Sequence, residues 1–209
     1  FQGDATFNNT GSLRLGDGAG DLVVFQGALT AKTQPSIALA GTHKYFLAAS
    51  SIEVGSATSG SISLGAATSL MPQTGATGMT IILGNTTLLQ GNQLTLGSGL
   101  DTVLTLAGMT GSGANLNLNT TGAVAASGTW SGLTDFTVTQ AGSFELTGAL
   151  SAKNVSIVDI MGTNAFRVTG AVSLTGNLSA AGSANSYGVT LLGDTSVGGT
   201  TTLNNLGDV

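Results

Sequence analysis

Two segments of eight residues, Phe144–Ser151 (FELTGALS) and Phe166–Ser173 (FRVTGAVS), decide the fold. They align without a gap. In each, an aromatic, a charged and an aliphatic residue precede Thr-Gly-Ala, and an aliphatic residue and Ser follow it. The second segment begins soon after the first has ended. Self-similarity at such a short period is typical of a repeat architecture, in which each turn of the chain stacks on the next.

The same period extends in both directions along the chain. Gly27–Lys32 (GALTAK) nearly reproduces Gly148–Lys153 (GALSAK), which follows about five periods later. The glycines of the repeated motifs are Gly122, Gly148, Gly170 and Gly193, and we take them as equivalent positions of successive coils. We therefore predict coils of roughly 22 to 26 residues, the length in which a parallel β-helix accommodates two or three short strands.

Short apolar runs recur from one end of the chain to the other. Leu13–Leu15, Leu22–Phe25 and Ile81–Leu83 are examples, and turn-forming residues follow them closely. Short apolar runs bounded by Gly, Asn, Ser or Asp are typical of strands joined by tight turns. Apolar residues nowhere keep the helical spacing of i, i+3, i+4 and i+7 for three turns. The pattern predicts an all-β protein.

Charged residues are scarce. The chain of 209 residues has 5 Lys and Arg against 10 Asp and Glu, and residues 54–100 carry no charge. A β-sandwich normally places charged side chains on its exposed faces and edge strands. A β-helix pairs each inner strand with the coils on either side and carries Thr, Ser and Asn on its outer faces. We predict one parallel β-helical array over residues 1–209, with tandem antiparallel β-sandwiches as the alternative.

The composition also excludes several classes of function. No cluster of Lys and Arg is present to neutralise a phosphate backbone, so we expect no nucleic-acid partner. Without cysteine the chain has no disulfide, thiolate metal site or cysteine nucleophile. No uninterrupted apolar segment is long enough for a transmembrane helix, so we expect no membrane span.

The two ends of the chain resemble each other. Gly3–Gly11 (GDATFNNTG) is similar to Gly199–Gly207 (GTTTLNNLG). Two coils of one solenoid can share such a pattern. A tandem array, in which this chain is one unit of a longer repeat protein, explains it as well. We predict the tandem array.

The N-terminal segment resembles a known class of proteins. Leu15–Ala31 (LGDGAGDLVVFQGALTA) and Pro35–Thr42 (PSIALAGT) resemble units of giant bacterial β-strand-repeat surface proteins, which are close to filamentous-haemagglutinin-like and autotransporter-type adhesins. Asn117–Val124 and Phe136–Gln140 resemble later parts of the same unit. The resemblance implies an extracellular or bacterial cell-surface location and an adhesive or fibrous role. It implies no catalytic residue.

Nothing in the sequence predicts an enzyme. His43 is the only histidine, so a Ser-His-Asp triad or a histidine metal site would require it. Lys44 follows it and no acidic residue lies within nine positions, so we interpret His43 as a turn or solvent-facing residue. The carboxylates are scattered along the chain. Glu145 and Arg167 occupy equivalent positions of the aligned segments and are expected to form an ion pair between coils.

Calcium is the one cofactor that the sequence raises. Gly97–Val103 (GSGLDTV) fits the Gly-x-Gly-x-Asp-x-aliphatic core of the calcium-binding β-roll, with Asp101 as its carboxylate. The motif occurs once, whereas a β-roll needs adjacent copies. Asp17 and Asp21 lie in a glycine-rich loop and are the other candidate ligands. For all three aspartates a simple turn is the preferred interpretation, and no cofactor is predicted.

Two binding functions are weighed beside a structural one. Stacked Thr-x-Thr motifs, such as Thr137–Thr139, raise ice binding, but the matches do not recur at the coil period. Recognition of a glycan or another surface by an adhesin domain is the second alternative. The preferred hypothesis is a structural unit of a secreted or cell-surface fibre whose main partner is itself, through stacking of strands and coils.

Overall fold

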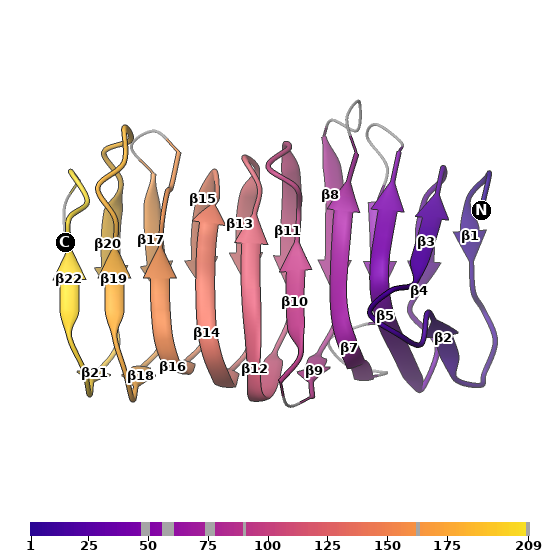
Figure 1. The fold of residues 1–209 in the computed structure, drawn as a ribbon, viewed down its shortest axis with the longest axis horizontal. Helices are drawn as coiled ribbons and strands as arrows, with labels where there is room; N and C mark the ends of the chain where they lie inside the picture. The colour runs from indigo at the N-terminus through magenta and orange to yellow at the C-terminus, as the bar shows by residue number, and fades with distance from the viewer. Residues whose placement is uncertain (47–50, 56–60, 74–77, 90, 162–163, 208–209) are drawn as a thin grey trace.

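The chain folds as a parallel β-solenoid, so the predicted fold class is confirmed. The computed structural model describes residues 1–46, 51–55, 61–73, 78–89, 91–161 and 164–207. Within these ranges there is no helix, and every strand pairing is parallel. Antiparallel sandwiches are therefore ruled out for this part of the chain. Figure 1 shows the strands side by side along the long axis, with the two termini at opposite ends.

One side of the solenoid is a nine-stranded sheet that receives one short strand from each turn. Its strands in spatial order are β1 (Ala5–Thr6), β4 (Leu29–Ala31), β6 (Ser51–Val54), β8 (Met79–Leu83), β11 (Thr102–Leu106), β13 (Ala123–Ala126), β15 (Ser143–Leu146), β17 (Ala165–Val168) and β20 (Gly188–Leu191). Eight full turns therefore separate the first strand of this sheet from the last.

The remaining strands form a thirteen-stranded sheet. They are β2 (Leu13–Leu15), β3 (Leu22–Phe25), β5 (Ser36–Tyr45), β7 (Ser61–Pro72), β9 (Thr86–Leu88), β10 (Gln93–Leu96), β12 (Met109–Asn119), β14 (Trp130–Gln140), β16 (Leu150–Ile157), β18 (Val172–Leu174), β19 (Leu178–Ala180), β21 (Thr195–Val197) and β22 (Thr201–Leu203). The longer strands β5, β7, β12, β14 and β16 span positions that two shorter strands occupy in other turns.

This sheet therefore has two flanks. The first flank contains β2, β9, β18, β21 and the N-terminal parts of the long strands. The second contains β3, β10, β19, β22 and the C-terminal parts of the long strands. Each full turn thus visits the nine-stranded sheet, the first flank and the second flank in that order.

The turns vary in length more than the sequence predicted. In the nine-stranded sheet the longest turn leads from Ile52 to its partner Ile81, and one of the two shortest leads from Leu104 to Val124. Both lie outside the predicted range of coil lengths, which is therefore too narrow. Strand pairing fixes which residues face one another but leaves the connections free, so connections can shorten or lengthen without disturbing the stack.

The core is a row of mainly aliphatic side chains, with some aromatic rings, between the two sheets. Alternate residues of each strand point inward, as in β8, where Met79, Ile81 and Leu83 are buried. The larger rings stack from turn to turn. Phe144 and Phe166 lie with centroids 4.6 Å apart and planes 9° apart. A cluster with edge and tilted contacts extends this pair to Trp130 and Phe136.

The two segments that decided the fold are equivalent in the structure. Phe144 pairs with Phe166 in the nine-stranded sheet, and Ser151 pairs with Ser173 in the first flank. The predicted ion pair is present, with Arg167 Nε 3.7 Å from Glu145 Oε1. Both side chains are about half exposed, so the pair adds little to stability.

A column of glycines runs along the corner between the nine-stranded sheet and the first flank. A Cβ on Gly170 would lie 2.5 Å from the carbonyl carbon and oxygen of Gly148. The column consists of Gly108, Gly128, Gly148, Gly170 and Gly193, and in each of the last four a Cβ would meet backbone of the glycine one turn earlier. Only glycine allows the turns to approach so closely.

Gly122 does not belong to this column. It lies next to Gly142 of the following turn, just before the strands β13 and β15 begin. The predicted equivalence of Gly122 with Gly148 is therefore wrong.

Two other sequence similarities do not reflect equivalent positions. Gly27–Lys32 contains β4 of the nine-stranded sheet, whereas Gly148–Lys153 leads into β16 of the other sheet. Likewise Gly3–Gly11 contains β1 and Gly199–Gly207 contains β22, again in different sheets. Both pairs share a turn-and-strand pattern that the solenoid uses on more than one of its sides.

Candidate functional site

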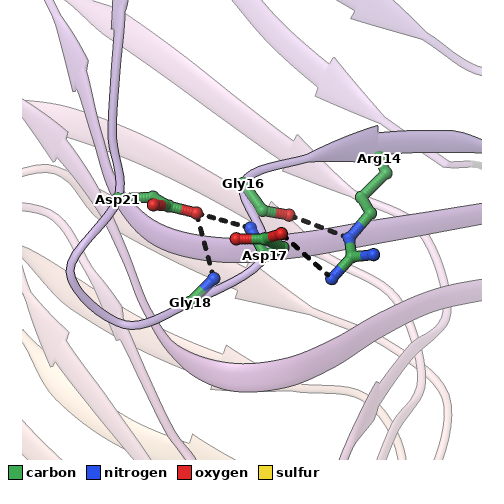
Figure 2. Close-up of polar contacts among 5 residues, drawn as sticks. All are labelled: Arg14, Gly16, Asp17, Gly18 and Asp21. Carbon is green, nitrogen blue, oxygen red and sulfur yellow. Dashed lines mark hydrogen bonds and ion pairs between the residues drawn. The ribbon is translucent and has the colours of Figure 1, made fainter.

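The loop after β2 contains two of the three predicted calcium ligands. Figure 2 shows Asp21 turned back across the loop, where Oδ2 accepts the backbone N–H of Asp17 at 2.6 Å and of Gly18 at 3.0 Å. The Asp17 carboxylate lies beside a cation, with Oδ2 3.9 Å from Arg14 Nη2. Arg14 also donates from Nε to the carbonyl oxygen of Gly16 at 3.3 Å. A shallow hollow of about 280 Å³ lies between these residues.

The two aspartates of this loop serve different partners. The N–H groups of Asp17 and then Gly18 hold the pKa of Asp21 below its usual range. Gly16 has φ +78° and its position would bring a Cβ against the Ala40 carbonyl, so the turn requires glycine here. The carboxylate of Asp21 therefore closes the loop, and the carboxylate of Asp17 faces Arg14. This geometry satisfies the loop with its own groups.

Asp101 lies elsewhere, next to the start of β11. The two glycines of its motif, Gly97 and Gly99, both have positive φ, and the Gly99 N–H donates to the Asn119 carbonyl of the next turn at 2.8 Å. The motif thus forms a tight bend that packs against the backbone of Asn119 in the next coil of the solenoid. Asp101 is several turns from Asp17 and Asp21, so the structure does not bring the three predicted ligands together. Within the described ranges, no three His, Asp or Glu side chains are grouped closely enough to hold a metal ion.

His43 is buried, and the prediction that it faces solvent is wrong. It lies within β5, fully inaccessible, with Nε2 3.1 Å from the Ala40 carbonyl oxygen. The two-residue alternation that buries Ile37 and Leu39 continues along β5, so His43 and Tyr45 also face inward. Burial lowers the pKa of His43. The Nδ1 atom of His43 and the Tyr45 hydroxyl are buried without a hydrogen-bond partner.

His43 occupies a column that is otherwise aliphatic. Its neighbours in register are Val23 and Leu70. The column continues through Leu96, Leu118, Val138, Ile157, Ala180 and Leu203. The imidazole therefore lies in the core, in a column of described residues of which none is acidic.

The outer face of the first flank carries a column of hydroxyls. One residue from each of seven successive turns contributes to it: Ser63, Thr87, Thr110, Ser131, Ser151, Ser173 and Ser196. Residues in adjacent parallel strands lie about 4.8 Å apart. This column is not a recurring Thr-x-Thr motif, because each turn contributes one residue to it and five of the seven are serine. The sequence hides the recurrence because the turns differ in length and Ser replaces Thr at several positions.

The second flank carries a broader polar face, which we call the polar ladder. It has two residues from each of six turns: Gln93 and Thr95, Asn115 and Asn117, Asp135 and Thr137, Asn154 and Ser156, Asn177 and Ser179, and Thr200 and Thr202. Their strands lie next to one another in Figure 1, from β10 to β22. A shallow hollow of about 280 Å³ over β10, β12 and β14 is lined by Gln93, Asn115, Asn117, Asp135, Thr137 and Thr139.

Side chains of the polar ladder tie successive turns together. The Asp135 N–H donates to Asn115 Oδ1 at 3.2 Å, and Asn154 Nδ2 donates to Asp135 Oδ1 at 2.9 Å. Asn154 Oδ1 then accepts the Asn177 N–H at 2.9 Å, and Asn177 Oδ1 accepts the Thr200 N–H at 2.8 Å. These amides therefore satisfy backbone groups where the strands begin.

The comparisons with known proteins identify no relative. No protein-family model, curated protein or solved structure matches this chain. The described part of the chain contains no helix that could cross a membrane.

Proposed function

We propose that this chain is a structural unit of a secreted or cell-surface bacterial fibre and that it associates with its own kind by stacking strands and coils. The observation that carries the proposal is the parallel stack itself, in which successive turns repeat the same three sides. In the described ranges, each strand between the first and the last turn pairs with a strand of the turn before it and with a strand of the turn after it. Unpaired strand edges are templates for further strands.

The outer faces support a structural role. The hydroxyl column and the polar ladder carry a single charged side chain, Asp135, and the amides of the ladder are largely engaged in holding the turns together. Such a surface repels a copy of itself weakly, because Coulomb repulsion needs like charges. The similarity of Leu15–Ala31 to bacterial β-strand-repeat surface proteins supports the same location and role.

Sedimentation velocity and negative-stain microscopy of the 209-residue chain test this proposal. We expect association that increases with concentration and rod-shaped particles of more than one length. Leu203→Lys places a charge at the edge of β22, and we expect it to weaken association. Ser151→Lys, at an exposed position of the interior strand β16, is the matched control and should associate like the unmodified chain. A chain that stays monomeric at high concentration would refute the proposal.

A second candidate function is recognition of a glycan, and the hollow of the polar ladder favours it. Six polar side chains line this hollow, and they offer both donors and acceptors to a polyhydroxylated ligand. A glycan array separates the two functions. Binding that is lost in Asp135→Ala and Thr137→Ala, by a chain that remains monomeric, would favour the adhesin domain over the structural unit.

A further inference from the structure

The corner in the middle of β5 fastens the loop after β2 to the solenoid. This loop joins β2 to β3, and these two strands pair with β5 on either side of Ala40 and Gly41. The Asp21 carbonyl accepts the Thr42 N–H at 2.8 Å. Gly16 lies against the Ala40 carbonyl and Gly41 against the Asp21 carbonyl, so closely that neither position has room for a Cβ. The loop in Figure 2 therefore depends on the backbone of this corner.

His43 holds the same corner from inside the core. Its Nε2 lies 3.1 Å from the Ala40 carbonyl oxygen. A carbonyl oxygen only accepts, so Nε2 carries the proton of the neutral ring and Nδ1 is the nitrogen that would take up a second one. Nδ1 is buried without a hydrogen-bond partner. Protonation would therefore create a buried N–H and a buried positive charge that have no acceptor.

The strands packed on either side of His43 offer no counter-charge. Its neighbours in register are Val23 of β3 and Leu70 of β7, and neither of these strands contains an ionisable side chain. Within β5, Lys44 lies on the outward side of the alternation. Tyr45 faces the core, and burial raises the pKa of its hydroxyl, so it stays neutral.

The other charged groups of these turns lie outside the core. Arg14 and Asp17 face each other with side chains 65% and 73% exposed. The Asp21 carboxylate accepts two N–H groups of its own loop, which hold its pKa below the usual range, so it keeps its charge in mild acid. The Glu53 carboxylate of β6 is paired with Lys32. None of these carboxylates is free to neutralise an imidazolium in the core.

We propose that His43 makes the corner of β5 an acid-sensitive switch, in which protonation at Nδ1 opens β3, the C-terminal half of β5 and the loop after β2 together. The cation is hydrated only if the ring leaves the core, and the ring then releases the Ala40 carbonyl. The hydrogen bond to Ala40 opposes this step, but burial outweighs it.

The solenoid confines the opening to the turns around His43. Each turn of a solenoid contacts chiefly the turns before and after it, so one turn can open while distant turns stay folded. The column that contains His43 is aliphatic from β7 to β22. The other described turns therefore have no equivalent group, and the switch belongs to the turns of β3 and β5 at one end of the stack in Figure 1.

Hydrogen exchange of the unmodified chain, corrected for the intrinsic effect of pH, tests the proposal. The Thr42 and Phe46 amides donate to the Asp21 and Phe25 carbonyls and report on the corner, whereas the Leu150 and Thr169 amides report on distant turns. The open form takes up a proton with the usual pKa of about 6.5, so its population should increase up to about tenfold between about pH 7.5 and about pH 5.5. Protection of the distant amides should change by less than about twofold.

Two variants show whether His43 is the titrating group. His43→Leu places in the column the aliphatic residue that other turns have there, and His43→Gln keeps an N–H that can donate to Ala40 but takes up no proton. We expect both variants to lose the dependence on pH at the Thr42 and Phe46 amides. The comparison within the unmodified chain needs no variant, so it remains decisive where a variant does not fold.

Three results would overturn the proposal. The first is a change of less than about twofold at the Thr42 and Phe46 amides over this range of pH, since the linkage predicts more. The second is an equal loss of protection at the Leu150 and Thr169 amides, which would show that the whole solenoid opens. The third is an unaltered pH dependence in a folded His43→Leu or His43→Gln variant. The proposed association of the chain is measured separately by sedimentation, so each of these results leaves it standing.

Discussion

Replacing Gly170 with alanine tests whether the glycine column sets the spacing of the turns. The new Cβ would lie 2.5 Å from the carbonyl carbon and oxygen of Gly148 and 2.7 Å from the backbone nitrogen of Ala149. Real Cβ contacts essentially never fall below 3.0 Å, so the two turns must separate by several tenths of an ångström. All three atoms belong to backbone, and no flexible side chain can move aside instead.

Separating the two turns would stretch the two backbone hydrogen bonds that flank Gly170. The Thr169 N–H donates to the Leu146 carbonyl at 2.9 Å, and the Leu150 N–H donates to the Ala171 carbonyl at 2.9 Å. A buried group that loses its partner costs about 1 to 3 kcal/mol. Alanine stabilises by restricting the unfolded chain, but only by about 0.4 to 1 kcal/mol. We therefore expect Gly170→Ala to lower the free energy of unfolding by roughly 1 to 5 kcal/mol.

Gly65→Ala is the matched control. Gly65 lies in β7, its φ is not in the left-handed region, and a Cβ there would meet nothing within 4 Å. We expect this variant to be neutral or slightly stabilised. Urea unfolding followed by circular dichroism gives the overall change, and hydrogen exchange at the Leu150 and Thr169 amides locates it. Equal stability of the two variants, with unchanged protection of both amides, would refute the close contact between turns.

Three further predictions concern the core and the loop. Phe166→Ala removes a ring that is 1% exposed and stacked on Phe144, so we expect a loss of about 3 to 5 kcal/mol in urea unfolding, against about 0.5 kcal/mol or less for the neighbouring Arg167→Ala. Burial lowers the pKa of His43 below its usual 6.5, so the folded protein binds a proton at this imidazole less readily than the unfolded chain does. The melting temperature should therefore stay constant above about pH 6.5 and decrease as the pH falls below it. His43→Leu should remove this decrease and leave the melting temperature at about pH 8 no lower than that of the unmodified chain. Chelation with EDTA should leave the melting temperature unchanged, because the Asp21 carboxylate already accepts two backbone N–H groups. A large decrease would show that Asp17, Asp21 or Asp101 holds a structural cation, since a bound ion at saturation adds several kcal/mol to the free energy of unfolding.

The sequence predicted the class of fold well because strand and turn signals are local. The gapless alignment of Phe144–Ser151 with Phe166–Ser173 gave the correct register of two sheets and the ion pair between Glu145 and Arg167. This alignment worked because the corner within the two segments, from one sheet to the other, has the same length in both turns. Gly122 was misplaced because Thr-Gly-Ala is also the pattern of a different corner, one strand earlier.

The positions of outward-facing residues were harder to predict. Turns of unequal length break any fixed period, so the hydroxyl column and the polar ladder emerge only when strands are aligned one by one. His43 was misjudged because the charged neighbour Lys44 suggested a turn, whereas His43 keeps the two-residue alternation that begins at Ile37 and therefore faces inward. The glycine-rich loop of Asp17 and Asp21 was located correctly, but hydrogen bonding within the loop is a property of the folded backbone that spacing alone does not reveal.

The unequal turn lengths have a mechanical consequence. Each turn contacts chiefly the turns before and after it, so a force applied to the two ends acts on the turns in series. At about 3.4 Å per extended residue, a turn of roughly 20 to 29 residues that peels away adds roughly 70 to 100 Å of length, while a folded turn spans about 4.8 Å. A fibre built from such units would lengthen greatly under load without breaking, one turn at a time. Its shortest steps would come from the turns between β11 and β15, and its longest from the turn between β6 and β8.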